Sequence, residues 1–134
     1  MGTWNYKNFE NDDAQDLVSE VIEAGFKKVA EEIKLVALSS ENDYLEAPIE
    51  SRALAAIEII AAFKGNPSVD LPNEMRDWLA KSSDIKIDQE ILTLSKKALE
   101  RILGENSEIK ELWQEVADYE NWVNCIKDLE KRIS

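Results

Sequence analysis

The stretch that decides the fold runs from residue 48 to residue 64 and reads PIESRALAAIEIIAAFK. It is the least polar run in the chain. At about 100° per residue, its apolar side chains cover one side of a helical wheel and spread round both flanks. A helix that is apolar nearly all round is a buried one. We therefore expect this stretch to be the central helix of a helical domain.

One carboxylate, Glu58, interrupts this apolar helix. If Glu58 is buried, it needs a partner, because an uncompensated buried charge is strongly unfavourable. Arg52 lies on another face, so we expect the partner to come from the N-terminal arm, as the Trp4 indole N–H or backbone amides. We favour a structural contact between the arm and Glu58 over a functional site. The alternative is that Glu58 marks a solvated edge of the helix, with the small residues Ser51, Ala55 and Ala62 beside it.

The arm itself comprises residues 1–11 and carries three aromatic side chains without helical spacing. We expect the arm to be ordered, with Trp4 and Phe9 among the structural residues that pack on the domain. Asn11 is a suitable N-cap for the helix that follows, and Asp12 with Gln15 has the spacing of a capping box.

Apolar periodicity predicts the other helices. We expect helices over residues 13–38, 72–81 and 88–103, then one long helix or two over residues 107–133. Gly25 lies on the apolar stripe of the first, where a small residue would admit a close neighbouring helix. The stripes place these side chains in the core: Ala14, Leu17, Val18, Val21, Ile22, Phe26, Val29, Ile33, Val36, Met75, Trp78, Leu79, Ile91, Leu94, Ala98, Leu99, Ile102, Trp113 and Trp122.

No stretch alternates in the manner of a β-strand. The sequence therefore predicts an all-α fold, a single compact domain over residues 1–134. It would contain five or six helices around the central helix at about 48–64.

The charge of the chain is strongly acidic and unevenly placed. The net charge is −12 over 134 residues. Residues 1–50 hold twelve acids and four lysines, which gives −8 and leaves −4 for the remainder. Such a field repels nucleic acids and anionic membranes and attracts basic proteins, although it can also serve solubility alone. The candidate partner-binding residues are the acids at the start of the first helix: Glu10, Asp12, Asp13, Asp16, Glu20 and Glu23.

Several kinds of chemistry are excluded by composition. The chain has no histidine and one cysteine, Cys125, so it lacks an imidazole base and the ligands of an ordinary zinc site. We expect no catalytic, cofactor or metal site. The absence of an apolar leader and of an intramolecular disulfide framework favours the cytoplasm.

Three acidic patterns keep an enzymatic alternative open. Asp12-Asp13-x-x-Asp16 has the spacing of the magnesium-binding motif of isoprenoid synthases, but a helix cap with first-turn acids explains it as well. Glu20-x-x-Glu23 and Glu115-x-x-Asp118 are similar to the pairs that hold magnesium in all-α nucleotide pyrophosphatases. The alternative function is therefore a magnesium-dependent enzyme of that kind.

Three segments carry a family resemblance. They are GTWNYKNFENDDAQDL at residues 2–17, ALAAIEIIAAFKG at 53–65 and SEIKELWQEV at 107–116. The first resembles the opening of a bacterial family known only as domain of unknown function 4259, whose members begin Gly-Thr-Trp-Gly and continue Phe-x-Asn-Asp-Asp-Ala-x-Asp. The other two resemble its Ala-rich helix and its Ser-Glu-Leu-x-x-Leu-Trp segment. Asn5 and Lys7 depart from the pattern, where glycines are expected.

The resemblance implies a compact helical domain and no assigned activity. Together with the charge, it favours a non-enzymatic binding protein that meets a basic protein partner. A concrete version is an immunity protein that neutralises a basic nuclease toxin, its cognate toxin domain, in bacterial competition.

Overall fold

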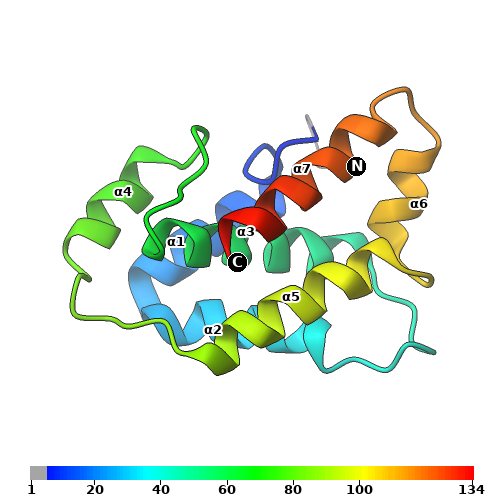
Figure 1. Ribbon diagram of the computed structural model, residues 1–134. Coiled ribbons are helices and arrows are strands. Elements are labelled where there is room, and N and C mark those ends of the chain that lie inside the picture. Colours follow the sequence, from blue (N-terminus) through cyan, green and yellow to red (C-terminus); the bar gives the residue numbers. More distant parts are fainter. Residues whose placement is uncertain (1–5) are drawn as a thin grey trace.

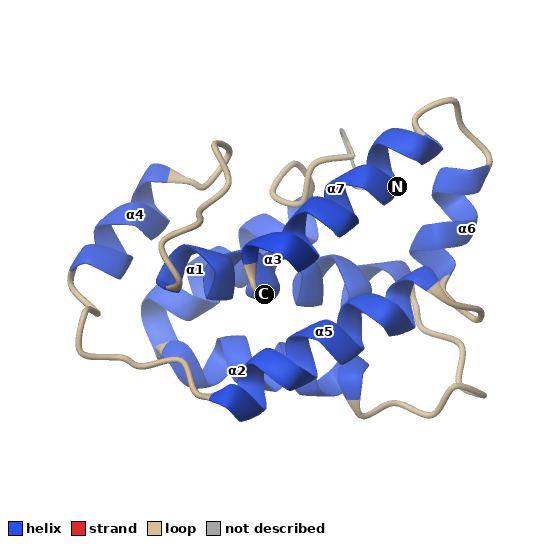
Figure 2. Ribbon diagram, in the orientation of Figure 1, coloured by secondary structure: helices blue, strands red, loops and turns tan. Residues whose placement is uncertain are grey.

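The computed structural model describes residues 6–134, and all the regular secondary structure in that range is helical (Figure 1; Figure 2). An isolated parallel bridge joins Leu45 to Ser107. The predicted all-α class is confirmed, but the described range holds seven helices rather than five or six. They are α1 (Asp12–Ala24), α2 (Phe26–Ala37), α3 (Ala47–Phe63), α4 (Asn73–Ala80), α5 (Gln89–Leu103), α6 (Glu108–Gln114) and α7 (Tyr119–Arg132).

The additional helix arises at Gly25, so the prediction of one continuous helix over residues 13–38 was wrong. Gly25 has φ +95°, a conformation that side chains with a Cβ disfavour, and its N–H closes α1 on the Val21 carbonyl. A Cβ at Gly25 would meet no atom within 4 Å. Backbone conformation, and not the close helix approach we expected, therefore explains this glycine. The apolar pattern runs through the break because α1 and α2 both pack on α3.

The apolar stretch at residues 48–64 forms α3, which begins one residue earlier, with Pro48 in its first turn. Every residue from Glu50 to Ala61 is buried except Arg52. The helix contacts α1, α2, α5, α6 and α7. In Figure 1, α4 and α6 lie at opposite ends of the molecule. Burial on all sides is what an apolar wheel without a polar face predicts.

The arm packs on the domain through Phe9, which is 3% exposed. Asn11 is the N-cap of α1, and its Oδ1 accepts a hydrogen bond of 2.8 Å from the Ala14 N–H. The Gln15 side chain donates to the Phe9 carbonyl at 2.8 Å, so Asp12 and Gln15 do not form the expected capping box. Trp4 lies outside the described residues.

The C-terminal apolar pattern forms two helices, α6 and α7, joined by a turn at residues 115–118. Trp113 of α6 and Trp122 of α7 are buried, as their stripe predicts. Five side chains placed in the core by periodicity are less buried than expected. Phe26, Trp78, Leu79 and Leu94 are half-buried, and Ile22 is 39% exposed, since it lies at the margin of the apolar face of α1.

None of the helices in residues 6–134 combines the length and hydropathy that crossing a membrane requires.

Candidate functional site

The first candidate site is a row of carboxylates along α1 and the residue pair before it. This acidic α1 face comprises Glu10, Asp12, Asp13, Asp16, Glu20 and Glu23. No lysine or arginine occurs from residue 8 to residue 26. Asp12, Asp16, Glu20 and Glu23 recur every three or four residues, a spacing that places them on one side of the helix.

The carboxylates of this face differ in what they contact. Asp12, Asp16 and Glu23 are exposed, while Glu10 and Asp13 are half-buried. Within residues 6–134, none of these five forms an ion pair. No cation therefore neutralises these five charges within residues 6–134. Among the predicted partner-binding acids, only Glu20 forms an ion pair in that range.

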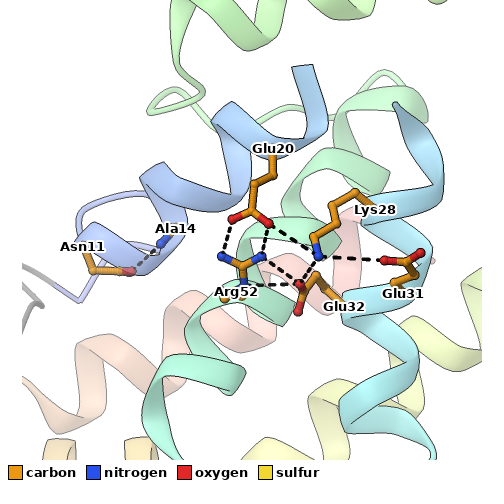
Figure 3. Close-up of polar contacts among 7 residues, drawn as sticks. All are labelled: Asn11, Ala14, Glu20, Lys28, Glu31, Glu32 and Arg52. Atoms are coloured by element: carbon orange, nitrogen blue, oxygen red, sulfur yellow. Dashed lines mark hydrogen bonds and ion pairs between the residues drawn. The ribbon is translucent and has the colours of Figure 1, made fainter. Parts of the chain in front are cut away.

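Glu20 is held by cations of the neighbouring helices (Figure 3). Its two carboxylate oxygens accept hydrogen bonds from both terminal nitrogens of Arg52, each at 2.8 Å. Lys28 Nζ lies 3.4 Å from the same group. The Arg52 hydrogen bonds lower the pKa of Glu20 to about 2. Glu20 therefore contributes less to the outward field than its neighbours on α1.

Arg52 also reaches Glu32 of α2, as Figure 3 shows. Its Nη2 donates to Glu32 at 2.8 Å and its Nε donates at 3.2 Å. Lys28 Nζ lies 3.3 Å from Glu32, which is 4% exposed, and 3.8 Å from Glu31. This charge cluster joins α1, α2 and α3 at the Gly25 break. The sequence provided one indication of this cluster, because Arg52 is the sole basic residue between positions 35 and 63 and is therefore a cation that the acids of neighbouring helices could contact.

Glu58 is buried, with 2% exposure, and its main partner is Arg132 of α7. The two terminal nitrogens of Arg132 donate to the two Glu58 oxygens at 2.7 and 2.9 Å. The arm supplies a third hydrogen bond, from Asn8 Nδ2 at 2.8 Å. The contact thus links α3 to the arm and to α7. The sequence predicted a partner in the arm, and the arm provides Asn8, but the cation lies 74 residues along the chain.

A cleft of about 500 Å³ adjoins this ion pair. It lies between the arm, residues 67–70 and α7, and its lining includes Asn121, Asn124 and Cys125. Burial raises the pKa of the Cys125 thiol to about 11, so the thiolate needed for a nucleophile is disfavoured at neutral pH. Arg132 and Glu58, which also line the cleft, are bonded to each other.

The acidic pairs of the enzymatic alternative are not brought together. Glu115 follows the last residue of α6 and Asp118 precedes the first residue of α7, so this pair lies in a turn and not on one helix face. Glu20 is engaged by Arg52, while Glu23 is exposed. In the described part of the chain, no three histidine, cysteine, aspartate or glutamate residues are placed to hold a metal ion.

Comparison with known proteins gives one match. No curated protein and no solved structure matches the chain. A family model described as "Domain of unknown function (DUF4259)" matches residues 2–124. This span contains all three segments on which the resemblance was based. Because the model covers nearly the whole sequence, the chain belongs to the DUF4259 family.

Proposed function

We propose that this chain is a non-enzymatic binding protein whose acidic α1 face contacts a basic protein partner. The observation that carries the proposal is the set of five carboxylates, Glu10, Asp12, Asp13, Asp16 and Glu23, without an ion pair in residues 6–134. Carboxylates grouped in this way raise the association rate of a basic protein by electrostatic steering.

The arrangement behind the face supports the proposal. α1 packs on α3, and Arg52 of α3 binds Glu20 at the inner edge of the face. We infer that α3 is the central element against which the face is held. A rigid array of charges loses little conformational entropy when a partner binds.

The partner we propose is a basic nuclease toxin domain, which this chain would neutralise in the cytoplasm as an immunity protein. The acidic α1 face would match the basic surface with which such an enzyme holds nucleic acid. Covering that surface would block the enzyme without any chemistry on the part of this chain.

The experiment that tests the proposal is co-expression and pull-down with the proteins encoded beside this gene, among which the cognate basic toxin domain is expected. The variant Asp12→Asn/Asp16→Asn/Glu23→Gln should slow association several-fold at about 0.15 M salt, where charges still act over about 8 Å. The control variant Asp84→Asn/Glu100→Gln/Glu130→Gln changes the net charge equally, on exposed residues elsewhere, and should bind like the wild type.

Failure of that toxin domain to co-purify or to be neutralised would refute the immunity function. Equal loss of binding in both triple variants would refute the α1 face as the site, because net charge alone would then explain the attraction. Magnesium-dependent turnover of nucleoside triphosphates by the purified protein would contradict the non-enzymatic function.

A further inference from the structure

Glu50 differs from the other buried glutamates in forming no ion pair within residues 6–134. Glu32, Glu50 and Glu58 are all buried. Glu32 is paired with Arg52, and Glu58 is paired with Arg132. Glu50 is fully buried, at 0% exposure, and no lysine or arginine of residues 6–134 lies within ion-pair distance. An ionised carboxylate in such a position is costly.

The two hydrogen bonds that Glu50 accepts both come from the beginning of α6. The Ser107 hydroxyl donates to Oε2, and the Ile109 N–H donates to Oε1 at 3.0 Å. The same junction carries the backbone pairing of Leu45 with residues 106–108, with hydrogen bonds of 2.9 and 3.0 Å. Glu50 therefore fastens the start of α6 to α3.

Charged and titratable groups face Glu50 from three other segments. On α5, the guanidinium of Arg101 donates to backbone carbonyls, including that of Glu105 at 2.9 Å, and not to a carboxylate. On α6, Glu108 accepts from the Ala47 N–H at 2.7 Å. In the segment before α3, the Tyr44 hydroxyl donates to Glu111 at 2.8 Å; the pKa of Tyr44 is raised chiefly by this hydrogen bond, and the charge of Glu50 adds to the effect. Arg101 favours the charged form of Glu50, whereas Glu108 opposes it.

Desolvation dominates this balance. It raises the pKa of Glu50 to about 7, against the lowering effects of Ser107, Ile109 and Arg101. Between about pH 4.5 and pH 7, Glu50 therefore keeps its proton in the folded state, whereas an exposed glutamate has already lost its proton. α6 is the element most able to respond, since it is seven residues long and buries only Ile109 and Trp113.

We propose that Glu50 is a proton-dependent latch for α6, which holds this helix most firmly when the carboxyl group is protonated and less firmly when it is ionised. Opening of α6 would hydrate the carboxylate. The ionised form gains from that hydration and the neutral form does not. The contribution of Glu50 to the free energy of opening α6 is therefore complete below about pH 4.5 and decreases as the pH rises towards about 7. Above about pH 7 it no longer changes.

Hydrogen exchange of the wild-type protein at pH 5 and pH 7.5 tests the latch directly. After correction for intrinsic exchange rates, protection of amides in residues 108–114 should fall roughly fifty-fold between the two conditions, as the raised pKa of Glu50 requires. These amides should also exchange faster than those in the middle of α3. If they exchange only together with the α3 amides, global unfolding explains the effect and the latch is refuted.

The variant Glu50→Gln keeps the shape of the side chain and, like a protonated carboxyl group, offers one acceptor oxygen and a donor group, but it cannot ionise. Protection of α6 should then be nearly independent of pH, while Glu115→Gln, an exposed control beyond the end of α6, should behave like the wild type. A second variant, Ser107→Ala, removes a donor to the ionised form and should extend the decline to higher pH. The proposal is overturned if Glu50→Gln retains the wild-type pH dependence, or if the Glu50 carboxyl titrates near pH 4.5 in a ¹³C NMR titration.

Discussion

At the scale of single residues, the ion pair of Glu58 and Arg132 joins α3 to α7. Two parallel hydrogen bonds between a guanidinium and a carboxylate fix both distance and orientation. Such a pair contributes little net stability compared with apolar side chains of the same size. Removal of Glu58 is different, because the largely desolvated Arg132 guanidinium loses both of these hydrogen bonds and, among residues 6–134, keeps only the exposed Asp128 as a carboxylate partner.

Glu58→Ala should therefore destabilise the protein by about 3 kcal/mol or more, and should lower the melting temperature by about 10 °C. The matched control is Asp128→Ala, which removes an exposed partner of the same Arg132 and should cost less than about 1 kcal/mol. Thermal unfolding followed by circular dichroism measures both. A melting temperature for Glu58→Ala equal to that of the wild type would show that the pair is not needed.

At the scale of elements, the break between α1 and α2 sets the direction of the acidic α1 face. A continuous helix would carry residues 26–37 straight on from α1, whereas the break lets both helices pack on α3. The charge cluster of Glu20, Lys28, Glu31, Glu32 and Arg52 then spans the break. Gly25 makes this geometry possible because its φ of +95° is strained for any side chain with a Cβ.

Gly25→Ala should destabilise the protein by about 1–2 kcal/mol through backbone strain, since the space around the glycine is open. Gly104→Ala is the control, because Gly104 has φ −85° and can accept a Cβ with little strain. Urea unfolding of the two variants gives the comparison. Equal effects would mean that conformation at Gly25 is not what selects glycine there.

At the scale of the whole molecule, two perturbed glutamates act on stability in opposite pH ranges. Glu20 has a pKa lowered by Arg52 to about 2. Its contribution to the free energy of unfolding is therefore present above about pH 4.5 and is lost as the pH falls towards 2. Glu50 has a pKa raised by burial to about 7. Its contribution is complete below about pH 4.5 and is lost as the pH rises towards 7. Repulsion within a chain of net charge −12 adds to the alkaline loss.

The free energy of unfolding should consequently be greatest near about pH 5 and should fall on both sides. Glu50 accounts for up to about 3 kcal/mol of the decrease between pH 5 and 8. Urea unfolding between pH 3 and pH 8 measures the profile. Added salt screens the surface repulsion but not the buried group, so the slope that persists at high salt should disappear in Glu50→Gln. A profile that rises steadily to pH 8 would contradict this assignment.

The sequence by itself determined the helices and their buried faces, because the periodicity of apolar side chains is a local property. The apolar wheel of residues 48–64 predicted α3 to within a residue or two, and three segments indicated the family. The sequence also indicated that Glu58 would need a partner if it were buried. The break at Gly25 was missed because the apolar residues before and after it have the spacing expected of one continuous helix.

Only the tertiary structure decided which partner each of these polar side chains meets. Glu58 pairs with Arg132, Glu50 with the start of α6, and Arg52 with Glu20 across 32 residues. With 28 acids and 16 basic residues in the chain, local pattern offers many equivalent pairings. Helix packing selects among them, since burial removes the water that would otherwise satisfy each charge equally well.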